Sequence, residues 1–251
     1  MQILLAPSEG KTAPASGPPL ALGRLSHSDE LTAARERVLD ALVRLSAGRS
    51  RKRALDALGL SKTQAGELER NAGLREAPTA PAGEVYTGVL YQHLALAELG
   101  SRARSRAADQ VLVASALFGV VGLGDPIPAY RLSIGARIPA LRKGLPAFWR
   151  PALARALPDE PGELVLDLRS GSYAAAWAPR HAAVVSIRAV TPEGKVISHM
   201  AKATRGRVAR AVLEARTQPR EPEAVAALAG PGARVLEAPG GWTVEVVDTN
   251  L

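Results

Sequence analysis

The sequence predicts a mixed α/β fold: a single domain spanning residues 1–251, with a central mixed sheet and flanking helices. Short runs rich in Leu, Val and Ile recur along the chain, and such runs are typical of strands that are buried on both faces. Several segments between these runs carry apolar residues at helical spacing. With 251 residues, of which 47% are hydrophobic, the chain is long enough to bury a sizeable core.

The first part of the chain predicts one strand and one long helix. The apolar residues 3–6 are expected to form a short buried strand, which a loop rich in Pro, Gly and Ser follows. Ser28 is placed to cap a helix over residues 29–45, in which Leu31 and Leu42 belong to the apolar face. We expect residues 36–72 to form a helical insertion within the domain.

Two further helices, at residues 51–58 and 62–70, are separated by a short junction of Gly59, Leu60 and Ser61. A glycine can adopt the positive φ that ends a helix, and a serine with Gln64 three residues later forms a capping-box pattern. This junction resembles the helix-hairpin-helix of DNA-repair proteins, with a serine in place of the second glycine. In that motif, backbone N–H groups at a helix start receive a phosphate, and Lys62 would add charge. The alternative is an ordinary helical hairpin with a solvated basic face.

The middle of the chain predicts a helix, a buried strand and a long loop. After a linker at residues 77–83, apolar residues at positions 90, 94 and 97 indicate one face of a helix. Residues 110–132 begin as a continuous apolar strand. Their second half contains three glycines and two prolines, which predicts a loop ending on Tyr130 and Arg131. Loops fed from buried strands are where α/β proteins place functional groups.

The last part predicts three more strands, a helix and a hairpin. Residues 163–173 and 182–190 are short and rich in β-branched side chains, as strands are. A further strand is expected to end at Ser198, before a basic helix that begins near residue 201. Residues 234–247 predict a β-hairpin that turns at residues 239–241.

Composition favours a polyanionic partner and excludes thiol chemistry. Lys and Arg total 32 against 24 Asp and Glu, giving a net charge of +8. Because only 4% of residues are aromatic, we expect no large base-stacking platform, so duplex DNA is favoured over single strands. The chain has no cysteine, and its 4 histidines lack metal-site spacing, so we expect no metal site and no cofactor.

The sequence also predicts where the protein resides. No apolar run approaches the ~20 residues of a membrane span, and the start lacks a secretory signal pattern. We therefore expect a cytoplasmic protein, a monomer, with no membrane partner.

The segment Gly10, Lys11 and Thr12 resembles the end of a nucleotide-binding P-loop, but the rest of the loop does not fit. A P-loop needs a glycine five positions before its final Gly-Lys, where this chain has Leu5. Pro7 removes one N–H donor, and a carboxylate would stand beside the anion. An NTPase is therefore rejected, which leaves unexplained why one short loop holds several polar side chains.

Six blocks in order resemble the YaaA family of peroxide-stress resistance proteins. They are ILLAPSEGKT at 3–12, VYTG at 85–88, LFGVVGLGDPIPAYRL at 117–132, Trp149 after LRKGLPAF, LDLRSGSY at 166–173 and AKATRGRVAR at 201–210. The resemblance implies a mixed α/β fold with a helix-hairpin-helix, a positively charged cleft that binds duplex DNA, and protection against peroxide linked to lower free iron.

The resemblance also implies which residues form the cleft. Carried over block by block, they are Ser8, Lys11, Thr12, Tyr86, Thr87, Asp125, Tyr130, Arg131, Arg169, Ser170, Lys202, Arg205 and Arg210. The hairpin contact to phosphate would come from Gly59, Leu60, Ser61 and Lys62. For single residues a structural role stays open: Tyr86 and Tyr130 as rim residues, Arg131 as the ion-pair partner of Asp125, and Trp149 as a core anchor.

Three functions remain as hypotheses. The first is double-stranded DNA binding with protection from damage. The second is an enzyme acting on a phosphorylated small molecule or on damaged nucleic acid, with Lys11, Tyr130 and Lys202 as candidate catalytic residues. The third, direct iron binding, is weaker because the sequence has no Glu-x-x-His pair.

Overall fold

A seven-stranded mixed sheet forms the centre of the protein, as the sequence predicts, with the strand order β4-β3-β1-β6-β7-β9-β8. The structure is a computed structural model and describes residues 1–157, 159–197 and 201–247. The strands are β1 (Gln2–Leu5), β3 (Val111–Ser115), β4 (Gly119–Gly122), β6 (Leu164–Leu168), β7 (Ala183–Val190), β8 (Arg234–Ala238) and β9 (Gly241–Val247). A separate two-stranded ladder pairs β2 (Ala80–Pro81) with β5 (Pro126–Ile127).

Strand β1 occupies a position where the direction of the chain across the sheet reverses. It pairs in parallel with β3 on one side, Ile3 opposite Val111, and in parallel with β6 on the other, Ile3 opposite Leu166. The chain first moves outward through β3 and the antiparallel β4, and then returns past β1 to β6 and β7. In open α/β sheets the carboxyl ends of strands at such a reversal border the ligand crevice.

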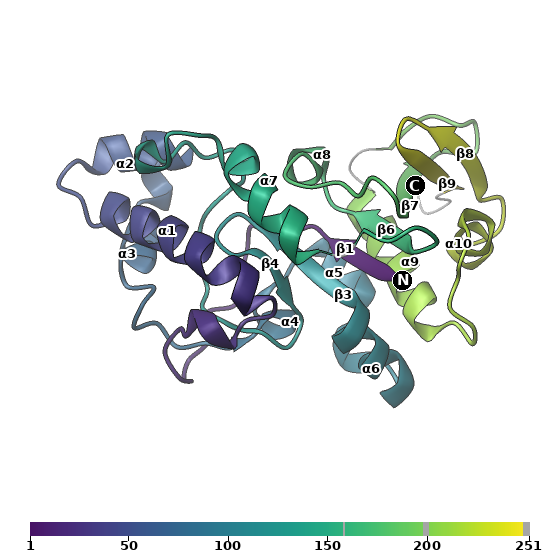
Figure 1. Cartoon of the computed structure of the whole chain (residues 1–251), viewed down its shortest axis with the longest axis horizontal. Coiled ribbons are helices and arrows are strands. Elements are labelled where there is room, and N and C mark those ends of the chain that lie inside the picture. Colours follow the sequence, from purple (N-terminus) through teal and green to yellow (C-terminus); the bar gives the residue numbers. More distant parts are fainter. Residues whose placement is uncertain (158, 198–200, 248–251) are drawn as a thin grey trace.

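Helices surround this sheet and extend beyond it. They are α1 (Ser28–Ser46), α2 (Arg51–Leu58), α3 (Gly66–Ala72), α4 (Ala82–Val85), α5 (Val89–Leu94), α6 (Ser101–Gln110), α7 (Leu145–Ala156), α8 (Gly171–Ala174), α9 (Ala201–Glu214) and α10 (Pro222–Ala229). Figure 1 shows α1, α2 and α3 together at one end, the sheet in the middle, and β8, β9 and α10 at the other end. Helix α6 packs on β3, α7 on β4, α9 on β7 and α10 on β9.

The helical segment agrees closely with the sequence prediction. Helix α1 covers the expected residues, and α2 has the expected bounds. Gly59 ends α2 with φ +66, the left-handed conformation that glycine adopts without strain. The third helix begins as a 3-10 turn over Lys62–Gln64 with a capping box between Ser61 and Gln64, and continues as α3.

The stretch expected to be a loop after β3 contains strands β4 and β5 instead. Ser115 accepts a hydrogen bond from the N–H of Phe118 (3.0 Å), and Gly119 has φ +76, so the chain reverses at once into β4. Val120 and Val121 are buried in the new strand. The sequence predicted a loop here because a glycine stands on each side of this valine pair, and glycine is typical of turns.

Besides the short helices α4 and α8, three longer helices, α6, α7 and α10, have no counterpart in the sequence prediction. Helix α6 turns only Ala103 and Ala107 into the core, so its apolar periodicity is weak. Helix α7 carries Pro151 in its interior, a residue that normally argues against a helix. Trp149 on α7 is fully buried, and its indole N–H donates to the carbonyl of Ala116 (2.9 Å), which confirms its role as a core anchor.

Of the last predicted strands, β6, β7 and the β8–β9 hairpin are confirmed. The strand expected to end at Ser198 is reduced, within the described residues, to one bridge between Val190 and Val196, and Ser198 itself lies outside them. The basic helix after it is α9. Gly206 lets α9 approach α5 closely, because a Cβ there would lie 2.3 Å from the carbonyl oxygen of Leu90.

Candidate functional site

A cavity of about 480 Å³ opens at the carboxyl ends of β1 and β6, where the sheet reverses direction. Its wall combines the loop after β1, the start of α5, the segment around Arg131, the loop after β6 and the first turn of α9. Seven residues that the family resemblance implies line this cavity: Ser8, Lys11, Thr87, Arg131, Ser170, Lys202 and Arg205. The topology thus gathers five distant parts of the sequence around one hollow.

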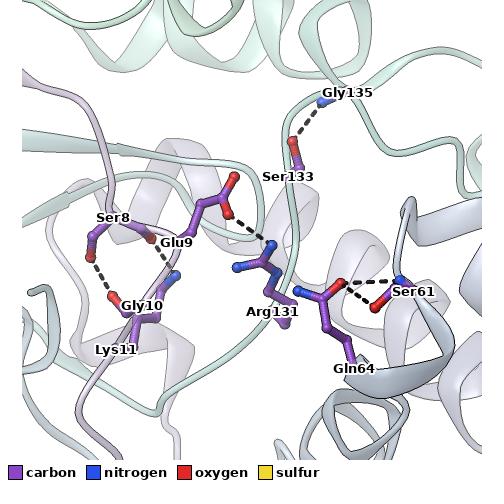
Figure 2. A network of polar contacts seen from close by, with 9 residues as sticks. All are labelled: Ser8, Glu9, Gly10, Lys11, Ser61, Gln64, Arg131, Ser133 and Gly135. Carbon is purple, nitrogen blue, oxygen red and sulfur yellow. Dashed lines mark hydrogen bonds and ion pairs between the residues drawn. The ribbon is translucent and has the colours of Figure 1, made fainter. Parts of the chain in front are cut away.

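The loop after β1 is held by its own side chains. The hydroxyl of Ser8 donates to the carbonyl of Gly10 (2.6 Å) and accepts from the backbone N–H of Thr87 (3.0 Å). The Nζ of Lys11 returns to the carbonyl of Ser8 (2.8 Å). Figure 2 shows this Ser8–Gly10–Lys11 turn from close by, with Glu9 reaching from it to Arg131. The turn explains why the short loop is rich in polar side chains, and it has no P-loop geometry.

Lys11 lies above two buried aromatic rings. Its backbone forms a bridge with Tyr86, and its Nζ lies 4.2 Å from the ring centroid of Tyr130 and 5.3 Å from that of Tyr86. Burial and the nearby Arg131 guanidinium lower the pKa of Lys11 from 10.5 to about 7, against the opposing effect of Glu67 and Glu9. A substantial share of this side chain is therefore a neutral amine near neutral pH.

The two tyrosines beneath Lys11 form a buried hydrogen-bonded pair. Their hydroxyl groups lie 2.9 Å apart, and that of Tyr130 lies 2.7 Å from the Oγ of Ser115. Burial raises the pKa of both phenols above the usual value of 10.0, so both remain protonated. Each side chain is 2% exposed, so neither is a rim residue.

Arg131 connects the cavity to α3. Its guanidinium pairs with the carboxylate of Glu9 (2.9 Å) and not with Asp125, the partner that the sequence suggested. The fully buried Asn71 of α3 donates to the carbonyl of Arg131 (2.8 Å) and accepts from its N–H (2.9 Å). The helical segment therefore fixes the backbone that carries a cavity cation.

The N-terminal part of α9 contributes two more cations, Lys202 and Arg205. The N-terminal end of a helix favours anions through its dipole and its free N–H groups. Burial lowers the pKa of Arg205, and Asp167 opposes this effect. Its Nε is buried and has no hydrogen-bond partner among the residues that the structure describes. One donor of a residue that lines the cavity is therefore unused.

The loop after β6 adds hydroxyl groups to the wall. The Oγ atoms of Ser170 and Ser172 lie 3.1 Å apart, and Tyr173 also lines the cavity. Ser172 and Tyr173 belong to the matched block at 166–173, so their proximity to Ser170 could have signalled them. Ser133 is also in the wall and had no such signal beyond its place two residues after Arg131.

Other expected cleft residues serve the framework around the cavity. The carboxylate of Asp125 accepts hydrogen bonds from Ser26 and from the N–H of Gly122. Arg169 makes a bidentate pair with Asp167 and donates to the carbonyl of Trp177.

The last two of the expected cleft residues, Thr12 and Arg210, lie on the surface. The N–H of Thr12 donates to the carbonyl of Val85 (2.9 Å), and its side chain is exposed. Arg210 pairs with Glu98 and Glu214 at the surface of α9.

The hairpin between α2 and α3 uses most of its own N–H groups. The N–H of Gly59 donates to Asp56, that of Leu60 to Leu55, and that of Ser61 to the side chain of Gln64. In the described part of the chain, Lys62 and Thr63 are the hairpin residues whose N–H groups have no acceptor. Glu67 and Arg70 of α3 affect the pKa of Lys11 electrostatically, so α3 lies near this side chain although none of its residues lines the cavity.

Within residues 1–157, 159–197 and 201–247, no group of three or more His, Asp or Glu could hold a metal ion. Over the same ranges, no helix is both long enough and apolar enough to cross a bilayer.

Fold and site together define a mixed α/β protein with a cation-lined cavity at the reversal point of its sheet. A sequence model of the family described as "Peroxide stress protein YaaA" matches residues 1–235. The chain therefore belongs to the YaaA family of peroxide stress proteins.

Relatives share nearly the whole length of the chain. A UPF0246 protein of Streptomyces coelicolor is 48% identical over 258 residues, covering 98% of both chains. A UPF0246 protein of Corynebacterium efficiens is 41% identical, covering 98% of this chain and 95% of the relative. One from Corynebacterium glutamicum is 38% identical, covering 94% and 95%.

Proposed function

We propose that the protein binds duplex DNA through the cation-lined cavity and the adjoining hairpin, and so limits oxidative damage to DNA. The observation that carries this proposal is the charge of the cavity wall, where Lys11, Arg131, Lys202 and Arg205 face a single carboxylate, Glu9. Cations that neutralise phosphates release counterions from DNA, which supplies most of sequence-independent affinity.

The hairpin extends this surface and acts as the helix-hairpin-helix of the protein. The unused N–H groups at Lys62 and Thr63 suit one backbone phosphate. Asn71 supports the idea of a shared surface, because it ties α3 to Arg131 in the cavity wall. The protein then acts as a cytoplasmic monomer, and lower free iron in the cell is an indirect result of its activity. Stoichiometric Fe(II) on the purified protein would contradict this indirect role.

The DNA proposal is tested by fluorescence anisotropy with a labelled duplex over a salt series. We expect affinity to fall steeply with salt, and each lost phosphate contact to reduce the slope of log K against log salt by about 1. We expect this slope to be reduced in each of three variants, Arg205→Gln, Lys202→Gln and Lys62→Gln. Arg234→Gln is the matched control, because Arg234 is exposed on β8 at the far end of the molecule (Figure 1). Affinity that does not change with salt, or an equal effect of the control, would refute the proposal.

A second candidate is an enzyme that acts on a phosphorylated small molecule or on damaged nucleic acid in the same cavity. Two observations favour it: the volume of about 480 Å³ suits a small ligand, and the amine of Lys11 is partly neutral near pH 7. Binding the phosphates of DNA requires neither an enclosed cavity nor a neutral amine. Incubation with a panel of nucleotides and lesion-bearing duplexes tests this candidate, and no turnover across the panel would count against it.

A further inference from the structure

The cavity wall contains the amine of Lys11, which has no carboxylate partner among the described residues, and the basic side chains of Arg131, Lys202 and Arg205. Lys11 packs over the rings of Tyr130 and Tyr86, and its recorded hydrogen bond goes to the carbonyl of Ser8. Glu9, the carboxylate in the wall, is engaged by Arg131. Among the described residues, no carboxylate forms an ion pair with the Nζ of Lys11. These surroundings suit an amine that acts as a nucleophile better than an ammonium that binds phosphate.

The other basic side chains of the wall suit a phosphate. Arg131 and Arg205 are guanidinium groups, which match the geometry of a phosphate, and Lys202 lies one turn before Arg205 on α9. Within the described residues, the buried Nε of Arg205 has no hydrogen-bond partner. The cavity therefore holds a nucleophile and a phosphate cradle within one volume.

We propose that Lys11 forms an imine with the carbonyl carbon of a phosphorylated aldehyde, whose phosphate is held by Arg131, Lys202 and Arg205. This inference rests on the proposed function, since it requires that the cavity bind phosphate. Two sources share the chemistry: the ring-opened deoxyribose of an abasic site in DNA, and a free sugar phosphate. A cavity of about 480 Å³ accommodates either a single nucleotide residue or a small sugar phosphate.

The step balances without any oxidant or reductant. The lone pair of Nζ attacks the carbonyl carbon, a C–N bond forms, and a proton moves from the nitrogen to the former carbonyl oxygen. The resulting hydroxyl takes a second proton from solvent and leaves as water, while the nitrogen lone pair forms the C=N bond. The product is a protonated imine on Lys11, and hydrolysis reverses it.

The charges that face Lys11 decide how the step depends on pH. They are Glu9 on its own loop, Arg131 beside it, Glu67 and Arg70 on α3, and Lys202 and Arg205 across the cavity. Burial, and to a smaller extent Arg131 and Arg70, lower the pKa of Lys11 to about 7, while Glu67 and Glu9 oppose this shift. Because attack needs the neutral amine, the initial rate of imine formation should rise about tenfold between pH 6 and pH 8.

The experiment traps the imine with borohydride and reads the adduct by intact mass and peptide mapping. One arm uses free 2-deoxyribose 5-phosphate, with 2-deoxyribose as its phosphate-free control, and the other uses a duplex with one abasic site. Lys11→Arg keeps the positive charge and removes the nucleophile, and Lys143→Arg, at an exposed position outside the cavity wall, is the matched control. Thermal denaturation checks that both variants fold, and mapping of the wild-type adduct locates the lysine without any variant.

We expect an adduct on Lys11, with at least tenfold less for the phosphate-free sugar and for Lys11→Arg, and a retained adduct for Lys143→Arg. An adduct in the free-sugar arm alone identifies a small-molecule source, and one in the duplex arm identifies DNA. No adduct in either arm, or an adduct on other lysines, overturns the inference. DNA binding is measured separately by anisotropy. DNA binding without an adduct would refute imine formation and support the DNA proposal. An adduct without DNA binding would support imine formation and refute the DNA proposal.

Discussion

Replacing Lys11 by methionine is expected to make the protein more stable at pH 7, although it removes a central residue of the cavity. Methionine retains the aliphatic contact with the rings of Tyr130 and Tyr86 without needing a charge. In the wild type, burial and Arg131 disfavour the ammonium form in the folded state. The unfolded chain has no such surroundings, so folding at pH 7 must either bury the charge or release its proton.

The size of the gain follows from the pKa of Lys11, which the fold lowers from 10.5 to about 7. A shift of this size disfavours the folded ammonium by roughly 5 kcal/mol relative to the unfolded chain. Lys11→Met loses the hydrogen bond to Ser8, about 1 kcal/mol, and the contact of the ammonium with the ring of Tyr130, about 1 kcal/mol. We therefore expect a net gain of about 3 kcal/mol at pH 7.

The gain has a defined pH dependence. Between pH 7 and pH 10.5 the unfolded wild type binds more protons at Lys11 than the folded wild type, so wild-type stability rises with pH in this window. Methionine does not titrate. The advantage of Lys11→Met should therefore be largest below pH 7 and should shrink steadily up to about pH 10.

Urea denaturation of both proteins at pH 6, 7, 8, 9 and 10 measures the difference directly. Taking the difference cancels other groups that titrate in alkali. Lys143→Met serves as control, because Lys143 is exposed, and it should change stability by less than about 0.5 kcal/mol at every pH. A variant less stable than the wild type at pH 7, or a gain that stays the same from pH 7 to pH 10, would refute the reasoning.

Three other substitutions test the framework of the site. Gly206→Ala places a Cβ 2.3 Å from the carbonyl oxygen of Leu90, so α5 and α9 must separate; we expect a loss of about 3 kcal/mol in urea denaturation, and unchanged stability would contradict this packing. Asn71→Ala removes two hydrogen bonds to the backbone of Arg131, and should cost about 2 kcal/mol in the same assay and weaken phosphate binding in calorimetry; full binding would show that α3 does not support the cavity. Arg35→Met leaves three backbone carbonyls without their donor, and a fall in melting temperature equivalent to about 3 kcal/mol is expected; a fall of less than about 1 kcal/mol would mean that water replaces the donor.

Local patterns in the sequence predicted the elements whose cause is local. The apolar spacing of α1 and the glycine that ends α2 act within a few residues, so the sequence alone reveals them. Ser28 was wrongly expected to cap α1, because it is the first residue of the helix and His27, without a side-chain hydrogen bond, precedes it at the cap position. The buried strands were equally visible, because parallel strands covered on both faces are continuous apolar runs. The family blocks also predicted seven residues that the structure brings to one cavity.

Other features depended on contacts that no local pattern encodes. Strand β4 forms because β3 offers it a partner, in spite of its flanking glycines. Helix α6 is stable because its alanines pack on the core, although its own apolar face is narrow.

The roles of individual side chains were decided in the same way. Asp125 and Arg169 look like cleft residues in the sequence, and the tertiary structure engages both in holding loops beside the cavity. Asp125 lies 99 residues from Ser26, which it holds, and Asn71 lies 60 residues from Arg131.

The sequence by itself determined the class of fold, most of the strands, the helical hairpin and the basic character of the chain. The tertiary structure alone decided that Lys11 lies over two tyrosines and loses much of its charge, while Arg131, Lys202 and Arg205 surround the same cavity. The physical reason is that a pKa and a cavity depend on burial and on charges in space. Those are set by segments far apart in the chain that meet only when the sheet forms.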